Sequence, residues 1–438
     1  MKGLKLQLLP VQFEETEEAF SSTAWVLPHE LNAPKPRDAL REREVPQEDL
    51  SLRNLPNVLP FVEVLPKVSV TASEKEIRQI AESDADVLIV TGGRDDEIKF
   101  LTQFGKPILP QWDSWGYVWN IRYLPGKDNY VFIPFGSQEV KDVLRALYAR
   151  KFLRQLQGVY FGDIPSHTIP NTFYNVEDMR GRFGVTLIRR PLRDYVATVQ
   201  AIEEQLGNKI GAKWAQIYRV KDDRSCKLGW YGRIYLAIKQ LLNKEKANAL
   251  SIDCAALPSA EYVPCFAVSQ LSDEGYVWSC EGDISALLAM ASLMGISQGP
   301  ATMGNIFENT THQDIEDNVI VLNHDVLPPS MACKGCPIVL HDFHGTGKGL
   351  TGYAELEAGR EITVLSIDQF ASKMWVVRGK IAWTENTVHC RVAIGVKVKN
   401  ARRIAKEIGG HHPAMVYGNF IQALNLLGKL LGIEVVEL

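Results

Sequence analysis

Hydrophobic and polar positions alternate along the chain with two periods, and their order predicts the elements of an α/β fold. Ser73 to Glu76 has the spacing of a helix-capping box, and the apolar positions that follow it predict a short helix. Residues 86–91 are typical of a buried strand, and residues 95–104 of a second helix. Strands that alternate with helices of this length favour a parallel, doubly wound sheet.

The same alternation begins again in the middle of the chain, with strand-like segments at residues 158–163 and 249–254 and a helical pattern at residues 231–243. Residues 283–294 are almost entirely apolar, which predicts a deeply buried helix. After about residue 305 the pattern changes to strand-like runs, and the period-two alternation of residues 390–398 favours an antiparallel sheet or barrel.

The length and charge of the chain narrow the classes of function. A chain of 438 residues suggests two or three domains. The net charge of -4 arises from 48 basic and 52 acidic residues without an obvious basic stripe, so nucleic acid is not expected as a partner. No apolar run approaches the ~20 residues that span a bilayer, and no signal peptide is evident. We therefore expect a cytoplasmic protein that does not enter a membrane.

The chain has seven cysteines, which we expect to be reduced thiols because the number is odd and no secretory signal is apparent. Cys333 and Cys336 form a CxxC motif. A structural zinc site normally needs a second such pair, which the sequence lacks, so a turn with two nearby thiols is the favoured interpretation. A redox or metal role is the alternative.

Two distant segments offer ligands for one divalent ion. Glu281 and Asp283 lie at the start of the predicted buried helix, and His411 and His412 precede an apolar strand. Carboxylate and imidazole together suit an ion such as Mn²⁺. A charge at Glu281 beside a buried helix needs compensation, which a bound cation would supply better than the helix N-terminus alone. The alternative is that both carboxylates merely cap the helix, and for Asp283 we favour the cap.

Four segments, taken in order and spacing, resemble the L-fucose isomerase and L-arabinose isomerase superfamily. They are residues 280–283 (CEGD), 304–305 (GN), 318–329 (NVIVLNHDVLPP) and 410–418 (GHHPAMVYG). The resemblance covers residues 150 to 438. It implies two doubly wound, Rossmann-like α/β domains followed by a β-rich, antiparallel, barrel-like C-terminal domain. The expected boundaries are 1–154, 155–302 and 303–438.

The resemblance also assigns roles at the metal site. It implies that Glu281 is both a metal ligand and an acid/base group, and that His412 is a ligand. His324 matches an additional histidine of arabinose-type sites, where it would be either a ligand or a residue that holds a ligand. For the second carboxylate, the sequence context points to Asn305 and the spacing from Glu281 points to Glu308, and both stay open. The implied ion is Mn²⁺, with Co²⁺ or Mg²⁺ as alternatives.

Further residues are candidates for contact with a sugar. His344 and Lys348 lie in a glycine-rich loop, either a flexible turn or one that closes over a hydroxyl, phosphate or sulfonate group. Trp112 and Asp113 could stack on a sugar ring and bind its hydroxyls, although core packing would also explain them. Asn419, just after the last motif, is a fifth candidate.

The combined interpretation is a metal-dependent aldose–ketose isomerase. Its substrate would be a pentose, a 6-deoxyhexose or a related monosaccharide, and its intermediate a cis-enediol. The resemblance implies a closed homo-oligomer, trimeric or hexameric, in which first-domain residues complete a neighbour's active site. One alternative, supported by Asn305, is a catalytically weakened relative that binds sugar or metal without turnover. Another is an unrelated metal-dependent lyase or epimerase.

Overall fold

The computed structural model divides the chain into two compact units, residues 3–144 and residues 145–438. The residues described are 3–13, 49–71, 73–91, 95–110, 139–164, 175–221 and 227–438. Helix α5 (Val140–Arg154) spans the boundary between the units. The predicted boundary between residues 302 and 303 lies within the second unit, where the α/β part and the β-rich part form one compact body.

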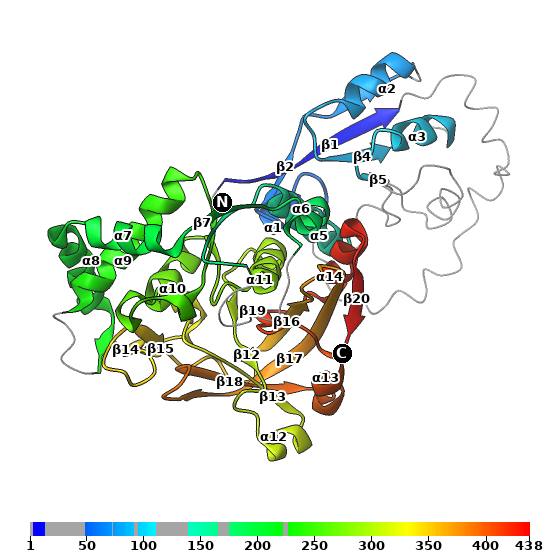
Figure 1. Cartoon of the computed structure of the whole chain (residues 1–438). Coiled ribbons are helices and arrows are strands. Elements are labelled where there is room, and N and C mark those ends of the chain that lie inside the picture. The colour runs from blue at the N-terminus through cyan, green and yellow to red at the C-terminus, as the bar shows by residue number, and fades with distance from the viewer. Residues whose placement is uncertain are drawn as a thin grey trace. The chain divides into compact units, whose positions relative to one another are not determined.

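The first unit contains a parallel sheet in the order β2-β1-β4-β5 (Figure 1). Strand β1 (Leu6–Phe13) lies between β2 (Val62–Val64) and β4 (Val87–Thr91), and β4 pairs with β5 (Ile108–Pro110). Strand β3 (Val68–Val70) also pairs with β1. The strand predicted at residues 86–91 is therefore confirmed, and so is its parallel pairing.

Among the described residues of this unit, the helices before α5 are α1 (Leu55–Val58), α2 (Glu74–Ala81) and α3 (Asp95–Thr102). Ser73 caps α2 as predicted, because its hydroxyl accepts the backbone N–H of Glu76. The Glu76 carboxylate bonds to the backbone and hydroxyl of Thr71 rather than to Ser73. Ile77 and Ile80 are buried, so the apolar spacing of the sequence places the correct face of the helix inward.

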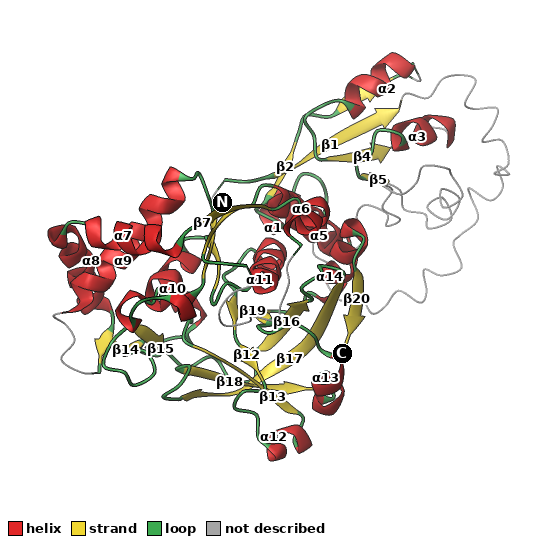
Figure 2. Cartoon of the chain, viewed as in Figure 1, coloured by secondary structure: helices red, strands yellow, loops and turns green. Residues whose placement is uncertain are grey.

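A second parallel sheet, in the order β10-β9-β6-β7, begins the larger unit. Its strands are β6 (Gln157–Phe161), β7 (Thr186–Arg190), β9 (Ala249–Ile252) and β10 (Val277–Ser279). The accompanying helices are α6 (Val176–Phe183), α7 (Leu192–Ala201), α8 (Glu204–Ile217), α9 (Leu228–Lys244) and α10 (Cys265–Asp273). Figure 2 shows α7, α8 and α9 gathered into one cluster.

Helix α11 (Ile284–Ser297) is the buried helix that the sequence predicts. Every residue from Ile284 to Ile296 is buried. The helix follows β10 directly and packs against β10, β16 and β19, so it joins the parallel sheet to the β-rich part (Figure 1). Its N-terminus is consequently an interior position of the unit.

The β-rich part is an eight-stranded sheet in the order β11-β19-β16-β17-β18-β13-β12, with β20 paired to β17. The strands are β11 (Thr302–Met303), β12 (Asn305–Ile306), β13 (Val319–His324), β16 (Glu361–Ile367), β17 (Lys373–Asn386), β18 (Val392–Val398), β19 (Ala414–Tyr417) and β20 (Glu434–Glu437). All pairs are antiparallel except β17 with β20. The predicted mixture of parallel α/β sheets and a barrel-like antiparallel sheet is thus confirmed.

This sheet nearly closes on itself at Gly304. The two strands at its ends, β11 and β12, are separated by that residue alone. The N–H of Gly304 donates to the carbonyl of Pro413 at 3.1 Å, and a Cβ added to Gly304 would lie 2.9 Å from the backbone nitrogen of Asn323. A close backbone approach of this kind accepts only glycine without displacement. Gly304 therefore holds the segments of His412 and His324 near each other.

A small sheet of β8 (Arg219–Val220), β14 (Val339–His341) and β15 (Thr351–Tyr353) completes the strands, and the remaining α-helices are α12 (His312–Glu316), α13 (Ala401–Glu407) and α14 (Ile421–Leu431). The expectation of reduced thiols is wrong for Cys333 and Cys336, which form a disulfide across a tight turn. Across the described parts of the chain, no helix combines the length and the hydropathy needed to cross a bilayer.

Candidate active site

Glu281 is held at the carboxyl end of β10 by a strained turn. Its backbone has a φ of 59°, and Gly282 follows with a φ of 70°. A positive φ is uncommon for a residue with a side chain and marks a conformation that the surroundings impose. The N–H of Gly282 donates to the carbonyl of Ile252, which ties the turn to the neighbouring strand β9. The carboxyl edge of a parallel sheet is where α/β proteins bind ligands.

His412 meets this turn through Asp283. Asp283 is the N-cap of α11, where Oδ1 accepts the N–H of Ala286 at 2.9 Å, as the sequence predicts. Its second oxygen, Oδ2, lies 3.0 Å from Nδ1 of His412, which is fully buried. Nδ1 therefore carries a proton toward Asp283, and Nε2 is directed at Glu281 Oε2, 3.4 Å away. A carboxylate behind a histidine in this manner is the usual support of a metal-bound imidazole.

His324 approaches Glu281 from the end of β13. Its Nε2 is 4.0 Å from Glu281 Oε1, and its ring centre is 5.4 Å from that of His412. The N–H of Asp325 donates to Nδ1 of His324 at 2.8 Å, so the neutral ring carries its proton on Nε2. His324 could bind a cation through Nε2 only after this contact is broken. In this arrangement the atom that faces the site is a proton donor.

The charges of these groups depend on one another. Burial favours the neutral form of Glu281, but the proximity and charge of His412 outweigh it and lower the pKa of Glu281 to about 2. Burial also opposes protonation of His412, yet the carboxylates of Asp283 and Glu281 raise its pKa to about 9. Burial, with the charge of His412, lowers the pKa of His324 to about 4. At neutral pH the group therefore contains two carboxylates, one cationic imidazole and one neutral imidazole.

Asn305 and Glu308, the two candidates for the second carboxylate position, contact each other. The amide Nδ2 of Asn305 donates to Glu308 Oε2, and Glu308 Oε1 lies 3.1 Å from Nδ1 of His389. Glu308 follows Phe307, whose φ is 67°, so this loop also has a residue in the left-handed region. Oδ1 of Asn305 is buried and makes no hydrogen bond within the described residues. The structure thus brings both candidates to one place.

His344 lies in the same region. Its Nε2 is 2.6 Å from Asp325 Oδ2 and 3.8 Å from the sulfur of Cys390, and its ring stacks on Phe343 with centres 3.7 Å apart. Asp325 follows His324 directly in the chain, so the neighbourhood of His344 adjoins that of His324. This contact places the glycine-rich loop of His344 near the end of β13.

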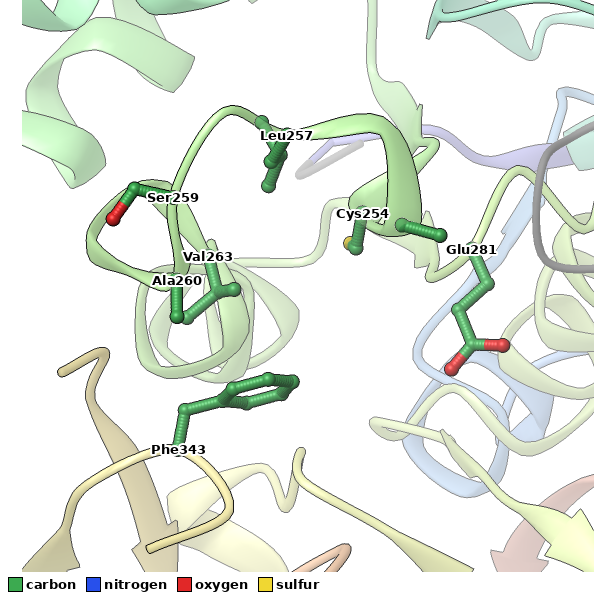
Figure 3. Close-up of a pocket in the computed structure, with 8 residues that line it drawn as sticks. Cys254, Leu257, Ser259, Ala260, Val263, Glu281 and Phe343 are labelled. Carbon is green, nitrogen blue, oxygen red and sulfur yellow. The ribbon is translucent and has the colours of Figure 1, made fainter. Parts of the chain in front are cut away.

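A pocket of about 270 Å³ lies beside Glu281 (Figure 3). Its other walls are Cys254, Ala255, Leu257, Ser259, Ala260, Val263 and Phe343. Figure 3 shows the Glu281 carboxylate at one end and Phe343, Ala260 and Ser259 toward the other. Cys254 and Ala255 follow β9, as Glu281 follows β10, so the pocket opens along the carboxyl edge of the parallel sheet.

The remaining predicted contacts are more distant or not described. Lys348 is half exposed and lies 3.9 Å from Glu261, next to Ala260 of the pocket wall. Asn419 is exposed at the far end of β19, on the order of 20 Å along the chain direction from His412. Trp112 and Asp113 lie outside the described residues.

Sequence reasoning missed three participants. They are Asp325, His389 and Cys390, which contact the predicted residues. His411, which the sequence offers together with His412, has its ring centre 4.3 Å from that of His412. The sequence does contain two adjacent pairs of polar residues, His324 with Asp325 and His389 with Cys390. Neither pair indicates, from the sequence alone, which other residues it contacts. For Asp283 the sequence favours a cap over a ligand, and the structure adds a contact of its second oxygen with His412.

The donor set fits a divalent cation. Glu281, His411 and His412 each offer one ligand atom within 4.8 Å of the others. Nε2 of His412, Nε2 of His324 and Oδ1 of Asn305 are buried polar atoms without a hydrogen bond in the described structure. Such atoms cost free energy unless a partner is supplied, and a cation held by Glu281 and His412 would supply one for Nε2 of His412. Imidazole and carboxylate suit Mn²⁺, Co²⁺ or Mg²⁺.

Comparison with known proteins points to one group. Residues 175–298 match the family model of the L-arabinose isomerase central domain. A sulfoquinovose isomerase of Priestia aryabhattai is 25% identical over 316 residues, which cover 67% of this chain and 66% of that protein. An L-arabinose isomerase of Erwinia tasmaniensis is 28% identical over 221 residues, or 47% of this chain and 43% of that protein. The chain thus spans slightly less than two thirds of the length of the first of these relatives.

Proposed function

Because the chain is related to the L-arabinose and L-fucose isomerase superfamily, we propose that it is a metal-dependent aldose–ketose isomerase. The named relatives are sugar isomerases, which are intramolecular oxidoreductases that interconvert aldoses and ketoses. The observation that carries the proposal is the arrangement of Glu281 and His412, with an ionised carboxylate facing a buried imidazole nitrogen that makes no hydrogen bond. His324 adjoins it, with Nε2 4.0 Å from Glu281 Oε1.

The residues that would hold the ion are Glu281 and His412, with His411 in reach. When bound, a divalent ion would act as a Lewis acid toward the two sugar oxygens at C1 and C2. Glu281 suits the role of ligand because a carboxylate with a pKa of about 2 stays ionised and is a weak proton acceptor. His412 would ligate through Nε2, with Asp283 keeping the proton on Nδ1.

Proton transfer between C2 and C1 requires a separate base, and we assign that role to Glu308. Its carboxylate is held by the amide of Asn305 and by His389, so it has a defined position without being fully buried. A base that removes the C2 proton and returns it to C1 on the same face produces the cis-enediol course expected from the resemblance. The Nε2–H of neutral His324 is placed to donate a hydrogen bond to a sugar oxygen near Glu281.

The pocket provides room for a monosaccharide beside these groups. The carbonyl end would lie at Glu281, and the other end would extend toward Ser259 and Phe343. Aromatic and small apolar walls suit the CH faces of a sugar. Lys348, near the rim through its contact with Glu261, is a candidate contact for an anionic substituent. Pentoses, 6-deoxyhexoses and sulfonated hexoses are accordingly all in the substrate range that we propose.

The test is proton NMR in deuterated water with metal-stripped and Mn²⁺-loaded protein. The panel includes L-arabinose, L-fucose and sulfoquinovose, and the readouts are ketose formation and deuterium at C2. We expect metal-dependent ketose with C2 exchange on at least one sugar. Glu281→Gln should abolish it, whereas the matched variant Glu407→Gln, which removes an exposed carboxylate paired with Arg403, should not.

Two outcomes would decide against the isomerase. Stoichiometric Mn²⁺ binding without turnover of any sugar would favour the alternative function, a relative that binds sugar or metal without catalysis. The observation that supports this alternative is Asn305, which stands where the resemblance leads us to expect an acidic residue. C2 exchange without ketose would point instead to an epimerase. We also propose a closed homo-oligomer, trimeric or hexameric, in the cytoplasm, which analytical ultracentrifugation and localisation would examine.

A further inference from the structure

A second group of metal-ligating side chains lies beside the proposed isomerase site. One nitrogen each of His344 and His389 and the sulfur of Cys390 all lie within 4.8 Å of one another. His389 and Cys390 belong to the turn that joins β17 to β18, and His344 belongs to the loop after β14. None of the three is a proposed ligand of the Glu281–His412 site, so they require a separate explanation.

The spacing of this group is close to that of a tetrahedral site. Zn²⁺ binds sulfur at ~2.3 Å and imidazole nitrogen at ~2.0 Å, so two such ligands at a tetrahedral angle are separated by about 3.6 Å. The sulfur of Cys390 is 3.8 Å from Nε2 of His344. The rings of His344 and His389 have centres 4.0 Å apart, which places the second imidazole on the same side. Small rotations of the side chains would bring all three to one ion.

A carboxylate contacts each imidazole. Glu308 Oε1 lies 3.1 Å from Nδ1 of His389, which leaves Nε2 of that ring for an ion. Asp325 Oδ2 lies 2.6 Å from Nε2 of His344, the nitrogen that also faces Cys390, so an ion bound there would replace the proton shared by these two atoms. Asp325 is itself fixed, because its other oxygen accepts the N–H of Arg391 at 3.0 Å. A carboxylate on the ring nitrogen that does not bind the metal, as Glu308 is for His389, orients the ring and raises its basicity as a ligand. Both carboxylates also contribute negative charge, which a dication would balance.

The backbone is strained at two of the three residues. His344 has a φ of 51° and Cys390 a φ of 53°. A residue with a side chain adopts this region only when its surroundings impose it, and such residues gather at functional sites. Cys390 is buried, and its turn is held by the Thr387 hydroxyl, which lies 2.8 Å from the carbonyl oxygens of both His389 and Cys390. The chain therefore imposes the position of this thiol.

We propose that His344, His389 and Cys390 bind a second divalent ion, of the zinc type, distinct from the ion of the isomerase site. Thiolate and imidazole favour Zn²⁺ or Co²⁺ over Mg²⁺. Binding replaces the S–H bond of Cys390 with a metal–sulfur bond and releases the proton to solvent. Three protein ligands leave the fourth position of the ion open. The site does not depend on the isomerase proposal, because its ligands and its readout are separate.

Cobalt titration of the full-length, metal-stripped protein tests the site, since a thiolate bound to Co²⁺ gives a near-ultraviolet charge-transfer band that oxygen and nitrogen ligands do not give. The parent protein carries Cys333→Ser and Cys336→Ser, because these cysteines with Glu355 form the other cysteine-containing group found among the described residues. We expect one thiolate-bound Co²⁺ per chain. Cys390→Ser should abolish the band, and the matched variant Cys254→Ser should retain it.

Two more variants keep the result interpretable. Glu281→Gln should retain the band, so loss of the isomerase site and loss of this site are distinguishable. His389→Ala, at a side chain that is 63% exposed and tolerant of truncation, should weaken Co²⁺ binding at least about tenfold even if Cys390→Ser fails to fold. No band in a parent with native circular dichroism, or a band that persists in Cys390→Ser, would overturn the proposal.

Discussion

Replacement of Asp283 by asparagine gives a sharp test of how His412 is prepared for a cation. Both carboxylate oxygens are used: Oδ1 accepts the N–H of Ala286 at 2.9 Å and Oδ2 accepts from Nδ1 of His412 at 3.0 Å. An amide of the same size has only one oxygen, so it cannot accept both protons. If it keeps the helix cap, its NH₂ group faces Nδ1, and the imidazole proton must move to Nε2, the atom proposed to bind the metal.

The magnitude follows from the cost of either orientation. Loss of the carboxylate behind a metal-bound histidine typically weakens metal affinity by about 10- to 100-fold, or about 1.4 to 2.7 kcal/mol. Turning the amide restores the contact with His412 but leaves the buried N–H of Ala286 opposite an NH₂ group, which costs about 1–3 kcal/mol. Both routes to the bound state carry a similar penalty. We therefore expect Mn²⁺ affinity to fall at least about fivefold in Asp283→Asn.

Isothermal titration calorimetry of Mn²⁺ into metal-stripped full-length protein measures this loss, with thermal unfolding as the check on folding. The matched control is Asp273→Asn. Asp273 is the last residue of α10, and its carboxylate accepts hydrogen bonds from Ser330 and contacts no histidine among the described contacts. Its Mn²⁺ affinity should equal that of the unmodified protein. Unchanged affinity in Asp283→Asn, in a protein that unfolds as the control does, would refute the assignment of His412 as a ligand supported by Asp283.

Four other results are expected. Mn²⁺ affinity should rise about tenfold per pH unit from pH 7 toward 9, because the ion displaces a proton from His412. Calorimetry in buffers of different ionisation enthalpy measures the released proton, and binding without proton release would contradict the ligand role of His412. Without metal, the stabilisation from the raised pKa of His412 is complete below its unfolded value of 6.5 and lost as pH rises through about 9, so the melting temperature should fall over that interval. Glu308→Gln should lower turnover at least about 100-fold with little change in Mn²⁺ affinity. Asn305→Asp should not raise turnover, and a higher turnover in that variant would assign the second carboxylate position to residue 305 instead. Gly304→Ala should lower both the melting temperature and Mn²⁺ affinity, since the added methyl meets the backbone of Asn323 at 2.9 Å, and a variant with native affinity would show that this contact does not position the site.

The sequence predicts those features that depend on local pattern. The buried helix at residues 283–294, its Asp283 cap and the strand in residues 390–398 follow from periodicity and capping chemistry, and the structure has all three. The resemblance also selects Glu281, His324 and His412, which the structure brings together, although their roles stay predictions.

Features that depend on the packing of distant segments were not predictable in this way. Asp283 and His412 are separated by 129 residues, and no local rule indicates that one oxygen of a helix cap would also face an imidazole. The same holds for Cys390, whose turn and whose partner His344 come from different loops. Proton positions on His324 and His412 depend on single hydrogen bonds, which a sequence pattern does not reveal.

The nearly closed sheet has a consequence for the order in which the protein folds. Hairpin neighbours such as β16 with β17 can pair while the chain between them is short, but β11 must wait for β19, which is far along the chain. Contacts of such high sequence separation form slowly because the intervening chain must be ordered first. His412 precedes β19, so it reaches Glu281 only when that last pairing is made. During refolding, the capacity to bind Mn²⁺ should therefore appear after most of the secondary structure, as the final event rather than the nucleus.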